Sequence, residues 1–164
     1  MRTSTWILVL FVGLMTTSLT AQETTWFDAN WQVTTKDNAK YYRPSPKKIK
    51  DGYWIVDYYQ NGKVQMEGFS SVNTPGEENF EGLVTYYFEN GTPSHEANYK
   101  DGKLHGIRKV YYESGELKEQ GKYKNGKREG IWKTFYKNGK IKEKGKYKNN
   151  EKVGVWKTFY KNVY

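Results

Sequence analysis

Two glutamates, Glu119 and Glu143, stand 24 residues apart and are the first residues whose types and spacing suggest chemistry. Paired carboxylates can hydrolyse a glycosidic bond when they face each other across one cleft with well-separated pKa values. These two occupy the same place in successive copies of one motif, so structural hydrogen bonding or pairing with nearby lysines is the better interpretation. His95 and His105 are the only histidines, and they have no cysteine or regular acidic companions, which disfavours a metal site.

Other catalytic signatures are missing from the sequence. It contains no nucleophile motif, phosphate loop or zinc signature, and it has no cysteine for a thiol site or a disulfide. Catalysis needs one unique constellation of side chains, whereas this chain duplicates a surface. We therefore predict a non-catalytic protein with no catalytic residues, cofactor, metal or small-molecule substrate.

Charge is divided unevenly along the chain. Residues 22–98 hold 7 Lys and Arg against 11 Asp and Glu, a net of −4, whereas residues 99–164 hold 19 against 7, a net of +12. The basic half could bind an acidic partner, namely anionic lipid headgroups, acidic envelope glycans or an acidic protein, or its lysines could simply solubilise a thin sheet. Nucleic acid is a less expected partner. The candidate binding residues are Lys133, Lys140, Lys142, Lys144 and Lys146.

The residues named so far belong to a repeat of 24 residues. GIWKTFYKNGKIKEKGKYKNNEKV at 130–153 follows GIRKVYYESGELKEQGKYKNGKRE at 106–129, and GVWKTFY begins again at Gly154. Asn-Gly and Asp-Gly turn signals recur twice in each period, which predicts two strands and two tight turns per unit. The expected fold is all-β, an elongated single-layer antiparallel meander of stacked hairpins. The approximate units are 52–81, 82–105, 106–129, 130–153 and a partial unit at 154–164.

The turn positions also predict which residues pair. If Asn138-Gly139 is a two-residue turn, Tyr136 pairs with Ile141, Thr134 with Glu143, and Trp132 with Gly145. If Asn125-Gly126 is the neighbouring turn, Gly121 pairs with Gly130, and Glu119 with Trp132.

This register gives the sheet two unlike faces. One is a structural face on which large rings cover the bare backbone of glycines. It comprises Gly121, Tyr123, Gly130, Trp132, Tyr136, Gly145, Tyr147, Gly154, Trp156 and Tyr160. The other face collects the candidate lysines, with Ile131 and Phe135 among them.

The N-terminal part differs in composition from the repeats. Residues 1–21 contain Arg2, the apolar run WILVLFVGLM and a plausible cleavage site near Ala21, which together predict a secretory signal peptide. The expected product is exported, either periplasmic or extracellular. Residues 22–51 are aromatic and irregular, so we expect them to cap the first edge of the sheet.

The repeated pattern G-x-W-x-x-[FY]-Y-x-N-G-x-[IL]-K-E-x-G-x-Y-K-N-G-K resembles the MORN repeat, in the bacterial variant of the YwqK-family antitoxin-like proteins. The resemblance implies an elongated, twisted sheet that serves as an interaction or assembly surface, with lipid binding also proposed for such arrays. The leading hypothesis is an exported scaffold that binds a protein or the cell envelope. The alternative is a toxin-neutralising or immunity-like protein that acts outside the cytoplasm.

Overall fold

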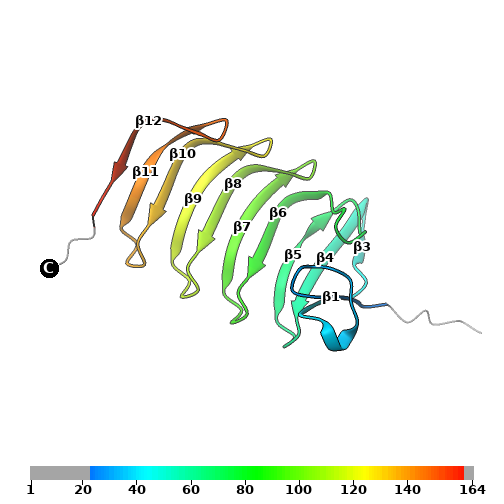
Figure 1. Ribbon diagram of the computed structural model, residues 1–164. Coiled ribbons are helices and arrows are strands. Elements are labelled where there is room, and N and C mark those ends of the chain that lie inside the picture. The colour runs from blue at the N-terminus through cyan, green and yellow to red at the C-terminus, as the bar shows by residue number, and fades with distance from the viewer. Residues whose placement is uncertain (1–22, 161–164) are drawn as a thin grey trace, which may run out of the picture.

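The structure, a computed structural model, describes residues 23–160 and confirms an open, single-layer antiparallel sheet (Figure 1). The segment expected to be a signal peptide lies outside the described residues. From β4 onward each strand pairs with the next in the chain, and β3 pairs with β4 beside β2. The strands are β1 (Thr25–Phe27), β2 (Tyr41–Arg43), β3 (Lys47–Ile49), β4 (Gly52–Tyr59), β5 (Val64–Ser70), β6 (Phe80–Tyr87), β7 (Pro93–Lys100), β8 (Lys103–Tyr111), β9 (Leu117–Lys124), β10 (Lys127–Phe135), β11 (Ile141–Lys148) and β12 (Glu151–Thr158), with a short 3-10 helix η1 at Lys36–Asn38.

Turns of one kind join the two-strand units and behave as the sequence predicts. Asn125 and Gly126 both have positive φ, at 50° and 78°, and Lys124 pairs directly with Lys127 across them. Asp101-Gly102 and Asn149-Asn150 repeat this geometry. These are two-residue turns in which both central residues are left-handed, the reason Asn and Gly recur there.

Turns of the second kind, within each unit, contradict the predicted register. Only Gly139 is left-handed there, and the amide of Tyr136 donates to the carbonyl of Lys140, so the loop holds three residues instead of two. The side chain of Asn138 accepts a hydrogen bond from the amide of Lys140, which fixes it as a turn acceptor. Phe135 therefore pairs with Ile141 in place of Tyr136, while the predicted pairs of Trp132 with Gly145 and Thr134 with Glu143 are confirmed.

A bulge in β10 overturns the register predicted between β9 and β10. Glu129 pairs with Lys122, but the next pair is Lys133 with Gln120, so residues 130–132 together oppose Gly121. The predicted pairs of Gly121 with Gly130 and of Glu119 with Trp132 are wrong, and Glu119 pairs with Thr134 instead. The cause is Gly130, whose φ of 74° bends the strand and inserts extra residues.

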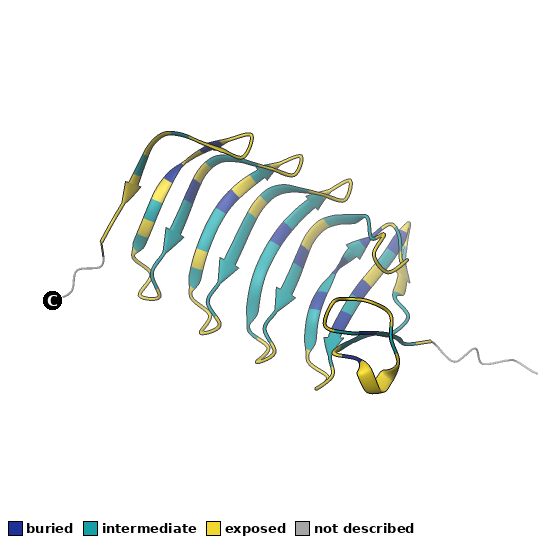
Figure 2. Ribbon diagram, viewed as in Figure 1, coloured by how far each residue is buried: buried dark blue, intermediate teal, exposed yellow. Residues whose placement is uncertain are grey.

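The N-terminal segment extends the sheet and covers part of one face. Strand β2 adds to β4, β1 adds to β2, and the chain between them loops in front of the sheet (Figure 1). The principal apolar core lies nearby, where Ile55, Met66 and Val84 are buried. Elsewhere buried residues are scattered along the strands, and the turns are exposed (Figure 2). Among the described residues, none belongs to a helix long and apolar enough to cross a membrane.

Candidate functional site

A ladder of rings runs across one face of β9 to β12. Tyr123, Trp132, Tyr147 and Trp156 contact one another edge to face, with centroids 5.2, 5.6 and 5.0 Å apart in turn. Alternating edge-to-face contacts of this kind stabilise a packed surface. The ladder therefore forms a continuous aromatic core for the C-terminal half of the sheet.

Two cations of the chain itself cover this ladder. The guanidinium carbon of Arg128 lies 4.4 Å from the ring centre of Trp132 and 5.2 Å from that of Tyr147. The ammonium of Lys152 lies 3.9 Å from the ring centre of Trp156. Trp132 is only 2% exposed as a result. The aromatic rings are thus engaged within the protein, and little of their surface is offered to a partner.

Apart from the four rings of the ladder, the residues predicted for this face divide into three groups. Gly121 lies directly under the indole of Trp132 and Gly145 under that of Trp156, whereas the predicted register places Trp132 opposite Glu119 and Gly145. Gly130 and Gly154 instead have positive φ and open space beside them, so they form bulges and no ring covers them. Tyr136 lies at a turn and donates its hydroxyl proton to the carbonyl of Phe159, and Tyr160 is 85% exposed.

The lysines predicted to bind an acidic partner also separate. Lys133 of β10 pairs directly with Lys144 of β11, which pairs with Lys157 of β12. Lys146 stands beside them on β11, opposite Ile131. These four residues, Lys133, Lys144, Lys146 and Lys157, are called the lysine face below.

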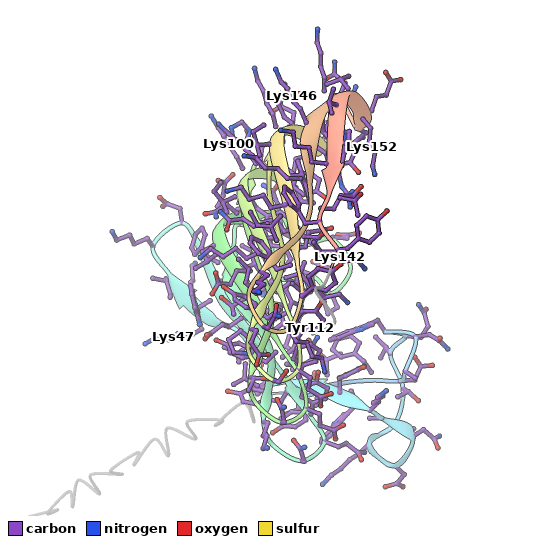
Figure 3. The ribbon with its side chains drawn as sticks, turned by 90° about the vertical axis from the view of Figure 1, so that its left-hand side faces the viewer. Lys47, Lys100, Tyr112, Lys142, Lys146 and Lys152 are labelled. Atoms are coloured by element: carbon purple, nitrogen blue, oxygen red, sulfur yellow. The ribbon has the colours of Figure 1, made fainter. Side chains whose placement is uncertain are left out.

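The other two predicted lysines are placed differently. Lys140 borders the turn after β10, and the ammonium of Lys142 lies 5.9 Å from the ring centre of Tyr136. In a view along the stacked strands, Lys100 and Lys146 lie on one side of the sheet and Lys152 on the other (Figure 3). The sheet thus carries lysines on both sides. Lysine also pairs with lysine beside two of the turns, Lys100 with Lys103 and Lys124 with Lys127, but among the described strands only the lysine face aligns lysines across three successive strands.

The N-terminal end holds an ion-pair network that no motif in the sequence indicates. Arg43 of β2 donates to both oxygens of Asp57 on β4, at 2.6 and 2.8 Å, and to Glu78 at 2.5 Å. Burial disfavours the charged guanidinium, but bonds to these carboxylates outweigh that effect and raise the pKa of Arg43. A cavity of about 310 Å³ adjoins the three residues, lined also by Trp31 and Tyr86. The network ties the cap to the sheet.

The carboxylates and histidines considered for catalysis have structural contacts. Glu119 forms an ion pair with Arg108 at 3.2 Å, and Glu143 with Lys152 at 3.0 Å. His95 stacks on Tyr86 with ring centres 4.1 Å apart, and burial, with a smaller effect of the Arg108 charge, lowers its pKa to about 4. Between residues 23 and 160, no three His, Cys, Asp or Glu side chains gather where they could hold a metal ion.

The two-faced, single-layer array of similar hairpins defines the chain as a β-repeat protein. Three consecutive segments, residues 80–101, 104–125 and 128–149, match the family model described as a MORN repeat variant. Each segment spans one hairpin, β6–β7, β8–β9 and β10–β11 in turn. No curated protein matches the chain.

Proposed function

We propose that this chain is an exported, non-catalytic scaffold that binds an acidic protein or envelope surface through its lysine face. The observation that carries the proposal is the alignment of Lys133, Lys144 and Lys157 in direct cross-strand pairs. Like charges placed opposite each other destabilise a sheet. An anionic partner would offset the repulsion between the paired lysines, so the alignment favours binding of such a partner.

Ion pairs elsewhere in the sheet distinguish other lysines from those of the lysine face. Two other lysines of the sheet have acidic partners in the protein: Lys109 pairs with Glu96 at 3.4 Å, and Lys152 with Glu143. Within residues 23–160, none of the four lysines of the lysine face forms an ion pair. MORN repeats are often protein- or membrane-binding elements, which is consistent with a surface built for attachment.

The test is retention of envelope extract on the immobilised full chain at about 50 mM and about 500 mM salt, conditions that differ several-fold in charge screening. We expect the double variant Lys133→Gln, Lys144→Gln to retain less material at low salt and to lose most of its salt dependence. The matched control is Lys47→Gln, Lys48→Gln, which removes the same charge from β3 at the other end of the sheet. Equal retention by both double variants would contradict the proposal.

The toxin-neutralising alternative uses the same surface differently. It requires one protein partner bound tightly and in fixed stoichiometry, whereas an envelope scaffold retains acidic material in proportion to its charge. A single retained protein that saturates the chain one to one and survives high salt would favour the alternative.

A further inference from the structure

Four exposed aliphatic residues recur at the same place in successive units. Leu83, Ile107, Ile131 and Val155 each follow a left-handed glycine at a bulge and stand 24 residues apart. Their exposed fractions are 49%, 41%, 51% and 80%. The bulge turns each of them away from the following residue, which packs on the opposite face. We call these four residues the apolar ridge.

The apolar ridge lies on the same side of the sheet as the lysine face. Ile107 pairs directly with Lys122 of β9, and Ile131 pairs with Lys146 of β11. Three hollows of about 330, 320 and 340 Å³ lie along the ridge, between Leu83 and Ile107, between Ile107 and Ile131, and between Ile131 and Val155 in turn. The first hollow is lined by Lys109 and also by Glu96, and lysines line the other two, to both of which Lys144 contributes.

Lysines also border the ridge along the strands. On one side stands the row of Lys133, Lys144 and Lys157. On the other side Lys124 and Lys148 end β9 and β11, just before the two-residue turns. Over β8 to β12 the apolar residues of the ridge therefore alternate with Lys122 and Lys146. Lysines flank the ridge on both sides, with Glu151 paired to Lys148 as an acidic exception.

The spacing of the ridge matches one periodic element of proteins. Adjacent strands lie about 4.8 Å apart, so each two-strand unit advances the ridge by about 9.6 Å. An α-helix rises about 10.5 Å over seven residues, so side chains at heptad spacing meet successive hollows with little mismatch over three units. A helix laid across the strands would bury one apolar residue per unit.

We propose that the apolar ridge docks an acidic amphipathic helix of a protein partner, with apolar residues at heptad spacing and carboxylates on both flanks. This inference rests on the proposed function and specifies its partner. A second copy of this face is disfavoured because it would bring lysines against lysines. A membrane fits less well because the tryptophans typical of membrane interfaces, Trp132 and Trp156, lie on the opposite face.

The probe is a synthetic peptide of about 21 residues, three heptads long, with leucine at heptad spacing and glutamate on both flanks. Its control has the same residues in scrambled order. We expect the full chain to bind the amphipathic peptide at least about tenfold more tightly than the scrambled one, since only the former can seat its leucines. Equal affinity for the two peptides would overturn the proposal.

Variants of the ridge separate this inference from the proposed function. Ile107→Ser with Ile131→Ser should weaken peptide binding at least about tenfold, whereas Val33→Ser, at a residue 71% exposed in the cap, should not. If the ridge variant binds the peptide like the parent, the helix proposal fails, while salt-dependent attachment through the lysines can still hold. Binding to anionic phospholipid vesicles that depends on Ile107 and Ile131, without peptide binding, would assign the ridge to a membrane and also overturn it.

Discussion

The indole of Trp132 occupies the space that a β-carbon on Gly121 would need, because the added atom would collide with Cδ2 and Cε2 of the ring. Trp156 covers Gly145 in the same way, and Val84 covers Gly68 at the N-terminal end of the array. In the remaining unit Ala97 stands at the glycine position and pairs with Arg108. Alanine is larger than glycine, and the arginine side chain opposite it is more flexible than an indole. Each unit thus matches a covering side chain to a small residue on the neighbouring strand.

Adding one methyl group under the indole should therefore destabilise the array. We expect Gly121→Ala to lower the free energy of unfolding by about 1–3 kcal/mol through overpacking, and Trp132→Ala to lower it by about 3–5 kcal/mol through the lost ring. Urea unfolding of both variants and of their combination gives the coupling. Gly121→Ala should cost little once Trp132 is removed, and strictly additive losses would show that the ring does not rest on this glycine.

A hydroxyl missing from one unit offers a gain in stability. Tyr112 and Tyr136 donate to the backbone carbonyls of Phe135 and Phe159 in the next unit, at 2.8 Å each. Phe88 holds the equivalent turn position without a hydroxyl, so Phe88→Tyr should reach the carbonyl of Tyr111. We expect a rise of about 0.5–1.5 kcal/mol in the free energy of unfolding.

The matched variant for this test is Tyr112→Phe, which deletes the equivalent hydrogen bond of the following unit, from Tyr112 to the carbonyl of Phe135. It should lower the free energy of unfolding by a similar amount. Chemical denaturation measures both changes. A Phe88→Tyr protein no more stable than the parent would mean that the bond does not link successive units.

Burial of His95 makes stability depend on pH in a defined window. The pKa of His95 is lowered from 6.5 to about 4, by burial first and by the charge of Arg108 second. At a pH between these two values, His95 is protonated in the unfolded chain and neutral in the folded chain. The contribution of neutral, buried His95 to the free energy of unfolding is complete above about pH 6.5 and is lost as the pH falls towards 4.

The variant His95→Phe keeps a ring against Tyr86 and removes the titration. Between pH 7 and pH 4.5 the parent should lose about 1–2 kcal/mol more than this variant, a value that allows for the partial exposure of the imidazole. Urea unfolding at the two pH values gives the difference. Equal losses in the two proteins would show that His95 titrates normally when folded.

The sequence predicts the repeated hairpins well because glycine and asparagine at fixed spacing permit few alternatives. Asn125-Gly126 specifies a two-residue turn, and the sizes of glycine and tryptophan predict that rings cover glycines, although the covering of Gly121 by Trp132 depends on the bulge at Gly130. The predicted register is wrong where a glycine is compatible with two backbone arrangements. Gly139 can end a two-residue or a three-residue loop, and Gly130 can lie under a ring or make a bulge, and the choice depends on neighbouring strands.

The surfaces are predicted less completely for the same reason. Five lysines look equivalent by spacing, but the extra residue at the turn after β10 places Lys142 against Tyr136 and leaves Lys133 and Lys144 aligned. The partner of Lys144 on its other side, Lys157, could be found only from the pairing of β11 with β12. The network of Arg43, Asp57 and Glu78 joins residues far apart in the chain that no motif connects.

Lys144 lies between two like charges, so its substitution should change folding and attachment in opposite directions. Lys144→Glu replaces two repulsive cross-strand pairs, with Lys133 and Lys157, by two attractive ones. At low salt we expect the free energy of unfolding to rise by about 0.5–1 kcal/mol. The same substitution replaces the central positive charge of the lysine face by a negative one, which should weaken the binding of an acidic partner.

The most direct test of the lysine face as a binding surface is therefore a paired measurement on Lys144→Glu and the parent chain. Urea unfolding and retention of acidic envelope material are measured in the same low-salt buffer. The expected result is a variant that is more stable than the parent and retains less material. A variant that retains as much as the parent would contradict the account, whatever its stability.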